Sequence, residues 1–378
     1  MTNRERLFAV LEGRRPDRVP IWLLFPYHRT SYYVDVRTNP CYRAIFELSR
    51  RCAVMLDRRN LSCPLWTSEV EVRHAALEEN GWSVKRMTVA HHGRTLVAET
   101  RRRADECIVK KLIGNEDELD VFLTLPILTG RAEIEAALAP QLPAYAAERA
   151  EFPREYGAMM LDLGEPIGAL YQHANLTEYP IWSLTRDAEI RAWLERVQQR
   201  CRVIYRFCLE RDLAEVYFLV GSELASPPMV SRATFQQWIV PHAQELIAMI
   251  HAHGCKVIQH YHGQIKEILP DFLTMAPDAL HTIEAPPTGN CTFSEAFSIV
   301  GDAIALIGNI QYDCFRSCTP DEMRAAVKAV LDECRGRRLI LSPTAGPYEE
   351  TLSERQIENY LAFIQAGWEC GAGGPSLL

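Results

Sequence analysis

Two histidines stand one residue apart in the stretch 256–263, which reads Lys-Val-Ile-Gln-His-Tyr-His-Gly. The stretch begins with apolar residues and ends with polar ones, as a buried strand does where it passes into a loop. Residues i and i+2 of a strand point to the same face, so His260 and His262 are expected to present both imidazoles to one side. A neutral imidazole is the commonest metal ligand in proteins. The pair is therefore either part of a metal site or two structural histidines that satisfy hydrogen bonds of the loop.

Polar residues also follow the next two predicted strands. Glu284 follows the first of them, and Asn309 ends the second. In an α/β barrel or an open parallel sheet, reactive groups gather at the carboxyl ends of the strands, so these side chains are expected to converge. Two imidazoles and one carboxylate leave coordination positions open, which suits catalytic Zn²⁺, or alternatively Fe²⁺ or another divalent transition metal. We therefore expect His260, His262 and Glu284 to be metal ligands.

Four further side chains near predicted strand ends are of types that suit catalysis. Glu223 could act as a general base or hold the N–H group of an imidazole. Arg29 could anchor a substrate carboxylate. Asn309 could orient the substrate, and Tyr348 could bring a phenol near the metal. An ordinary structural role is the alternative for each of the four.

The elements that would position these residues alternate between strand and helix. The alternation implies a parallel sheet, and the number of strands fits an eight-stranded TIM (β/α)8 barrel better than a doubly wound sheet. An eighth strand at 51–56 is less clearly marked than the others. No G-x-G-x-x-G or P-loop motif follows an early strand, which argues against a nicotinamide or nucleoside triphosphate site. The other predicted strands are 19–25, 159–163, 216–220, 256–260, 279–283, 304–308 and 338–342. Asp162 and Glu165, at the end of the second of these, are weaker candidates for the role suggested for Glu223.

The stretch 64–123 differs from this pattern. It alternates charged and apolar residues at 69–72, and Asn80-Gly81 is a strong hairpin signal between two such runs. These features predict a β-hairpin or antiparallel meander inserted at the barrel mouth, where it could form a lid or a wall of the substrate site. The chain is thus expected to be a single domain, 1–378, with this insertion.

Composition limits the function classes. The chain has 378 residues and a formal net charge of -8, which argues against a nucleic-acid partner. The first 18 residues are polar and no run reaches the roughly 18 apolar residues of a membrane span, so we expect a cytoplasmic protein without a membrane partner. The 12 cysteines contain no C-x-x-C pair and are expected to be mostly reduced and buried.

Several segments resemble a known family. They look like the uroporphyrinogen decarboxylase-like (URO-D) superfamily over essentially the whole chain, which implies a TIM barrel. That superfamily holds the true decarboxylases, the zinc methyltransferases that move methyl groups from corrinoid proteins to thiols, and more distantly the cobalamin-independent methionine synthases. The segments are Asn-Arg-Glu-Arg-Leu at 3–7, Arg-Pro-Asp-Arg-Val-Pro at 15–20, Gly-Asn-Ile at 308–310, Thr-Pro-Asp-Glu at 319–322, Leu-Ser-Pro at 341–343 and the closing helix at 359–367.

The resemblance disfavours uroporphyrinogen decarboxylation itself. True decarboxylases carry Arg-Gln-Ala-Gly-Arg after the first strand to hold substrate carboxylates, where this chain reads Phe-Pro-Tyr-His-Arg at 25–29. The aspartate expected after the next strand is absent from 60–66, and the histidine expected near the last strand is absent from 341–350. A substrate with eight carboxylates needs several cations, and this mouth is expected to be acidic.

The resemblance is closer to the zinc methyltransferase branch, which uses His-x-Cys at the strand end. His260 matches the histidine, His262 stands where the first cysteine would be, and Glu284 lies at a spacing like that of the glutamate ligand in the methionine synthases. No thiol is found near Thr344, where the second cysteine is expected. Replacing thiolates by imidazoles leaves a more Lewis-acidic metal, which favours polarising a carbonyl or activating water.

Three functions remain open at this point. The first is a metal-dependent methyl or alkyl transferase acting on a small molecule, with a corrinoid protein or a thiol as its partner. The second is a metal-dependent lyase, decarboxylase or hydrolase acting on a small carboxylate. The third is a non-catalytic binding protein that has kept the barrel. A homodimer is compatible with each of them.

Overall fold

A parallel sheet forms the centre of the molecule. The computed structural model of the chain describes residues 1–30 and 33–372, and within these ranges seven strands pair in the order β1-β6-β7-β8-β9-β10-β11. Every neighbouring pair in this sheet is parallel. The strands are β1 (Met55–Arg59), β6 (Gly157–Leu161), β7 (Val216–Val220), β8 (Lys256–His260), β9 (Ala279–His281), β10 (Ala305–Ile310) and β11 (Leu339–Pro343).

The segment that precedes β1 closes this sheet into a barrel. Ile21 forms a parallel bridge with Leu341 of β11, and Trp22 forms one with Val54 beside β1. The Trp22 N–H donates to Leu341 O at 2.8 Å, and the Val54 N–H donates to Ile21 O at 2.6 Å. The expected TIM barrel is therefore confirmed. The strand expected at 51–56 is also present, shifted a few residues toward the C-terminus as β1.

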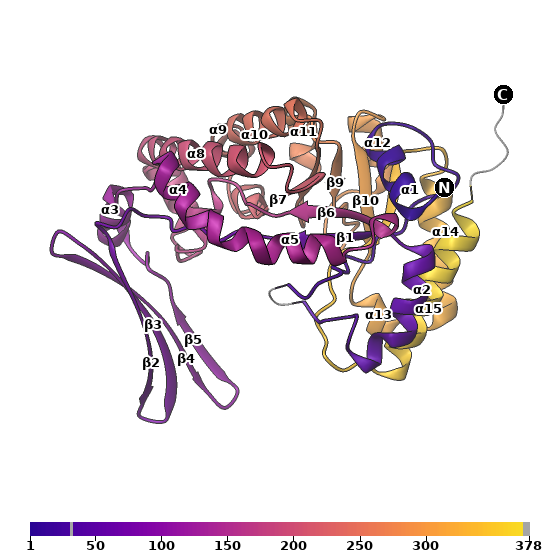
Figure 1. Ribbon diagram of the computed structural model, residues 1–378, viewed down its shortest axis with the longest axis horizontal. Coiled ribbons are helices and arrows are strands. Elements are labelled where there is room, and N and C mark those ends of the chain that lie inside the picture. The colour runs from indigo at the N-terminus through magenta and orange to yellow at the C-terminus, as the bar shows by residue number, and fades with distance from the viewer. Residues whose placement is uncertain (31–32, 373–378) are drawn as a thin grey trace.

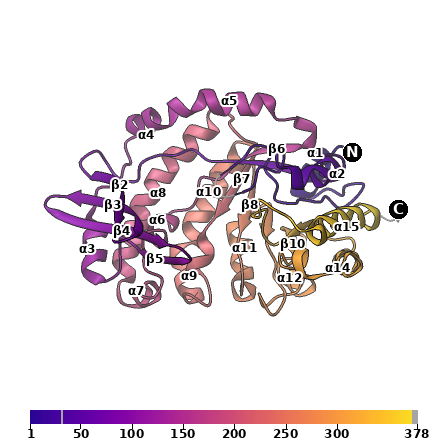
Figure 2. The same cartoon turned by 90° about the horizontal axis from the view of Figure 1, so that it is seen from below.

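Helices surround the sheet on its outer face (Figures 1 and 2). None of the helices in the described ranges is long and apolar enough to cross a membrane. The α-helices are α1 (Asn3–Leu11), α2 (Arg43–Cys52), α3 (Glu116–Thr124), α4 (Arg131–Leu138), α5 (Leu142–Glu151), α6 (Gly168–Tyr171), α7 (Tyr179–Thr185), α8 (Asp187–Leu209), α9 (Arg232–Trp238), α10 (Val240–Ala252), α11 (Leu269–Met275), α12 (Phe293–Val300), α13 (Cys314–Ser317), α14 (Pro320–Glu333) and α15 (Glu354–Cys370). The 3-10 helices are η1 (Pro40–Tyr42), η2 (Ala139–Gln141), η3 (Arg154–Tyr156), η4 (Ser222–Ala225) and η5 (Lys266–Ile268).

Helix α1 packs against the residues that fill the inside of the barrel. A capping box starts this helix, because the Glu5 N–H donates to Thr2 Oγ1 at 3.1 Å and the Thr2 N–H donates to Glu5 Oε2 at 2.7 Å. Its Leu7 and Val10 join the buried cluster formed by inward-facing strand residues such as Ile258. The helix thus covers the amino-terminal end of the barrel, and reactive groups are left to the carboxyl end.

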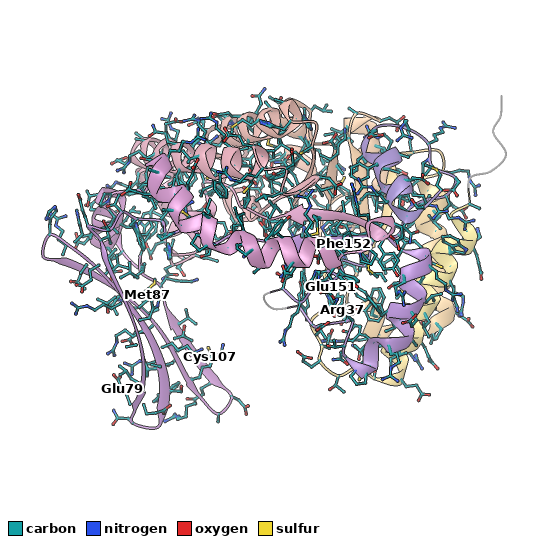
Figure 3. All side chains as sticks on the ribbon, viewed as in Figure 1. Arg37, Glu79, Met87, Cys107, Glu151 and Phe152 are labelled. Atoms are coloured by element: carbon teal, nitrogen blue, oxygen red, sulfur yellow. The ribbon has the colours of Figure 1, made fainter. Side chains whose placement is uncertain are left out.

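A second sheet projects from the barrel, and we call it the arm (Figure 1). Its strands are antiparallel in the order β2-β3-β4-β5, which confirms the β-rich insertion expected in this third of the chain. Residues toward the far end of the arm, such as Glu79 and Cys107, lie well away from the barrel (Figure 3). The bounds 64–123 and a role at the barrel mouth stay predictions. The strands are β2 (Glu71–Glu79), β3 (Trp82–His91), β4 (Arg94–Arg103) and β5 (Glu106–Lys110).

Candidate active site

The two histidines of the His-x-His pair lie together at the carboxyl end of β8. The apolar residues Val257 and Ile258 bury the strand, which ends at His260. The ring centroids of His260 and His262 are 4.6 Å apart, with the ring planes nearly perpendicular at 88°. His262 follows the strand and its side chain is 37% exposed, so it faces the open end of the barrel.

A third histidine, which the sequence analysis missed, completes this group. His281 ends β9, pairs with His260 in the sheet register, and is fully buried. Its Nδ1 atom lies 2.7 Å from Nδ1 of His260, and the two rings are stacked with centroids 4.8 Å apart. The signal was present in the sequence, because His281 is a polar residue inside an apolar strand, two positions after the buried Ala279.

The hydrogen bonds of His281 fix the proton positions on both rings. Burial, and next the neighbouring His262, lowers the pKa of His281 to about 3, so the ring is neutral. Its Nε2–H donates to the carbonyl oxygen of Pro343 at 3.2 Å, which leaves the lone pair on Nδ1. Burial, and next the neighbouring His281, holds the pKa of His260 well below its usual range. His260 must therefore donate its Nδ1–H to His281, and the lone pair of His260 is on Nε2.

Glu284 stands beside these histidines as a carboxylate. Its Oε2 accepts the Gly263 N–H at 2.7 Å and lies 3.3 Å from Nδ1 of His262, and its Oε1 accepts from Gln311 at 3.4 Å. Burial acts to raise the pKa of this group, but the hydrogen bonds from His262, Gly263 and Gln311 outweigh it and lower the pKa. The strand that precedes Glu284 ends at His281 rather than at residue 283 as expected, and the following residues return the carboxylate toward His262.

The donor set matches a transition metal in chemical type. His260 offers a neutral Nε2 whose other ring nitrogen is held by a hydrogen bond, which is the usual state of a metal-ligating histidine. Among residues 1–30 and 33–372, however, no group of three or more His, Cys, Asp and Glu side chains is arranged so that it could hold a metal ion. His262 and Glu284 contact each other instead, at 3.3 Å. A metal bound by these residues would have to take the place of that contact.

Two carboxyl groups lie on the β6–β7 side of the barrel mouth. Glu165 is only 5% exposed, and its Oε2 accepts the hydroxyl of the buried Ser222 at 2.7 Å. Its Oε1 and the Oε2 of Glu223 are buried without a hydrogen-bond partner in the described part of the chain. Burial raises the pKa of Glu165 to about 8, and burial also raises the pKa of Glu223. Glu165 therefore carries a proton at neutral pH.

A cavity of about 570 Å³ opens on this side of the barrel mouth. Glu165 lines it, and so does Val220, which pairs with His260 in the sheet register. Arg58, near the end of β1, also lines it and forms an ion pair with Asp162. The sequence analysis missed Arg58, although it follows an apolar strand in the run Asp-Arg-Arg at 57–59. The lining of the cavity thus includes a guanidinium and a protonated carboxyl group.

The remaining predicted residues lie at different places. Asn309, half-buried in β10, pairs with Ser342 in the sheet register. The side chain of Arg29 is 63% exposed and lies 3.7 Å from Glu350. Tyr348 is 45% exposed. The structure therefore does not bring Arg29 into contact with the histidine group, and its role as an anchor stays a prediction.

Comparisons with known proteins agree with this architecture. Residues 171–367 match the model of the family described as uroporphyrinogen decarboxylase (URO-D). A solved methyltransferase from Methanosarcina mazei superposes with a TM-score of 0.59 at 18% identity, covering 98% of this chain and 99% of that one, and this likeness shows the fold. A B12-independent methionine synthase from Shewanella sp. W3-18-1, in complex with selenomethionine, gives a TM-score of 0.45 at 11% identity, covering 93% of this chain and 94% of that one. No curated protein matches the sequence.

Proposed function

The chain belongs to the uroporphyrinogen decarboxylase (URO-D) family, and from this premise we propose that it is a metal-dependent methyl or alkyl transferase. His260, His262 and Glu284 would hold the metal, with Zn²⁺ as the first choice and Fe²⁺ or another divalent transition metal as the alternative. The observation that carries the proposal is the hydrogen-bond chain from Pro343 O through His281 to His260, because it keeps the Nε2 lone pair of His260 available.

The residues of the chain would divide the work. A bound metal would supply a Lewis acid that lowers the pKa of a thiol or water. His281 would act as a positioning residue, since it holds the His260 ring through Nδ1. Gly263 and Gln311 would orient the Glu284 carboxylate through the hydrogen bonds that they donate to it. Glu284 would balance part of the positive charge at the site.

The carboxyl side of the mouth would serve the second substrate. The cavity of about 570 Å³ is of a size that accepts a small molecule. Glu165, which holds a proton, would donate a hydrogen bond to an atom of that molecule or a proton to a leaving group. Glu223 has an Oε2 atom without a partner among the described residues. It would receive the proton that a methyl acceptor, such as a thiol, gives up. Asn309 and Tyr348 would keep the substrate-orienting roles expected from the sequence.

One observation favours a second candidate function. Arg58 places a guanidinium in the cavity wall, where it could anchor a carboxylate if Asp162 moves aside. A metal-dependent lyase, decarboxylase or hydrolase acting on a small carboxylate would use such an anchor. A metal held by imidazoles rather than thiolates also suits that chemistry.

Metal analysis of the purified chain tests the proposal. We expect about one divalent metal per chain, and loss of most of it in His260→Ala and in His262→Ala, because a neutral imidazole is a dominant ligand. His74→Ala removes an exposed histidine of the arm and is the matched control, which should keep the metal. A chain that holds no stoichiometric metal after purification without chelators would overturn the metal site.

An activity assay separates the two candidate functions. Methylcobalamin as donor and dithiothreitol as acceptor probe methyl transfer in the metal-loaded protein. Methylation of the thiol that disappears in His260→Ala supports the transferase. Turnover of small carboxylic acids without thiol methylation supports the second candidate, and in that case Arg58→Ala should raise KM for the acid. A corrinoid protein as the natural donor would then be excluded.

A further inference from the structure

The arm has two free edges, and they differ in sequence. Strands β2 and β5 are the outer strands of its sheet, so each presents backbone N–H and C=O groups on one side. All five residues of β5 are exposed, and Ile108 and Val109 are each 55% exposed. An exposed edge with apolar side chains and no proline is a template for pairing with another strand.

The sequence of β5 is complementary to itself in the antiparallel direction. When two copies of Glu-Cys-Ile-Val-Lys pair about a two-fold axis at Ile108, Glu106 of each copy lies opposite Lys110 of the other. Ile108 then meets its own symmetry mate, and Cys107 meets Val109. The same register continues past the strand, where it places Asp105 opposite Lys111. Each half of the pairing therefore combines two opposite-charge pairs with apolar contacts.

The β2 edge does not share this complementarity. In full antiparallel overlap about Ala75, Glu71 of one copy lies opposite Glu79 of the other, which is repulsive. Val72 would lie opposite a second glutamate, Glu78. Glu79 is also held already, by Arg86 at 3.0 Å and by Arg101 at 3.1 Å. Charge thus favours the β5 edge over the β2 edge for pairing between copies of this chain.

We propose that a second copy of this chain binds along β5, in the antiparallel register centred on Ile108, so that two arms form one continuous sheet. The pairing is isologous, since the same patch serves both copies. The present partners of the two charged residues are easily exchanged: Glu106 pairs with Arg103 at 3.0 Å and Lys110 with Glu118 at 3.1 Å, in exposed ion pairs. An edge of five residues is short, so we expect a dimer of moderate strength that depends on concentration.

The register has a consequence for the position of the two arms. The turn at Ala104 and Asp105 of one copy comes beside residues 111–112 of the other, where the arm returns to its barrel. Lys111 donates to Gln172 O at 2.9 Å, and residue 172 lines the cavity at the barrel mouth. The proposal does not depend on the function proposed above, since it uses residues of the arm alone.

Sedimentation of the full chain over a range of concentrations tests the dimer. In Glu106→Lys, the new lysine of each copy lies opposite Lys110 of the other copy, so the dimer contains two repulsive pairs. We therefore expect the dissociation constant to rise roughly tenfold or more. The double variant Glu106→Lys with Lys110→Glu restores opposite charges, and its dissociation constant should return to near that of the natural chain. Glu71→Lys on the β2 edge is the matched control and should leave the dissociation constant unchanged.

A cysteine cross-link tests the register. In a Cys107→Ser background, Ile108→Cys places two thiols opposite each other at the two-fold axis, within the Cα distance that a disulfide allows. Oxidised glutathione should convert this variant to a covalent dimer, while Ala75→Cys in the same background should form no covalent dimer. The proposal is overturned by a chain that stays monomeric at every soluble concentration. A dimer that Glu106→Lys leaves unchanged, or a cross-link through Ala75→Cys alone, would also overturn it.

Discussion

The two sides of the barrel mouth contain different ionisable groups, and burial acts on them in opposite directions. On the β8–β9 side, burial lowers the pKa of His281 to about 3 and holds the pKa of His260 well below its usual range, so these two imidazoles are neutral. On the β6–β7 side, burial raises the pKa of Glu165 to about 8 and leaves a protonated carboxyl group. In water the order of these two pKa values is the reverse, since a carboxyl group loses its proton about two pH units below an imidazolium. The mouth thus combines neutral imidazoles with a carboxyl group that keeps its proton.

This reversal explains how the mouth could bind a metal and donate a proton at neutral pH. A neutral imidazole has a free lone pair on one ring nitrogen, so it can bind a metal without first releasing a proton. A carboxyl group that keeps its proton can donate it. Burial does not decide the pKa of Glu284 in the same way. Three hydrogen-bond donors outweigh its burial and lower its pKa. Hydrogen bonding, rather than burial alone, decides which groups at this mouth are charged.

The largest expected effect is on stability through Glu165. A carboxyl group with a raised pKa binds its proton more tightly in the folded state, so stability falls as pH rises from about 4.5 to about 8. The loss should be on the order of 4 kcal/mol for the natural chain and absent in Glu165→Gln, which cannot ionise. Urea unfolding at both ends of this pH range measures the difference between the two chains. Equal pH dependence in the natural chain and the variant would contradict the assignment of a proton to Glu165.

A smaller effect is expected on metal affinity through His281. Loss of the hydrogen bond to His260 in His281→Leu should weaken metal binding by about 10- to 100-fold. His281→Gln can still accept from His260 with its amide oxygen and donate to Pro343 O, so it should recover part of the affinity. Competition with a metal indicator measures both. Equal losses in the two variants would show that His281 acts through packing and not through its hydrogen bonds.

A third buried imidazole sharpens the comparison and carries the smallest effect. The backbone N–H and Nδ1 of His28 both contact the buried Asp57, at 2.8 and 2.7 Å, and Nε2 lies 3.4 Å from Glu151. Glu151, labelled in Figure 3, also pairs with Arg37. Burial acts to lower the pKa of His28, but these carboxylates outweigh it and raise the pKa. The environment of His28 thus favours the charged imidazolium, whereas His281 is neutral.

The pH dependence of stability tests this difference. A raised pKa of His28 in the folded state contributes stability that is present in full below about pH 6.5 and is lost as pH rises through the folded pKa. The stability advantage of the natural chain over His28→Gln should therefore be larger at pH 6 than at pH 9. Thermal or urea unfolding at these two values measures it. A stability difference that grows with pH would mean that His28 is neutral in the folded protein.

Most of the fold could be predicted because its signals are local. Apolar runs of about five residues, separated by helices, indicated the barrel strands, and the turn at Asn80-Gly81 indicated the arm. Side-chain parity along a strand brought His260 and His262 together. The same rule hid His281, because it would place residues 281 and 284 on opposite faces if the strand continued. In the structure β9 ends at His281, and the chain then turns so that the Glu284 carboxylate accepts the Gly263 N–H. This turn depends on contacts between residues that are distant in sequence.

The position of Arg58 at the barrel mouth and the protonation state of Glu165 could not be predicted for a related reason. Arg58 reaches the mouth only because β1 lies beside β6, which places it against Asp162, more than 100 residues later in the chain. The pKa of Glu165 depends on how completely the surrounding chain excludes water. Residue type and spacing do not carry that information. The metal, the substrate and the catalytic roles therefore stay proposals that the experiments above address.

The bridge between Ile21 and Leu341 has a consequence for how the protein is made. The first strand segment of the barrel must find its neighbour in the last strand, at the far end of the chain. During synthesis, residues 19–25 are made more than 300 residues before Leu341 and wait for this partner until β11 has left the ribosome. Such a long closure slows the final step of folding. The nascent barrel therefore remains open along one seam until β11 has emerged.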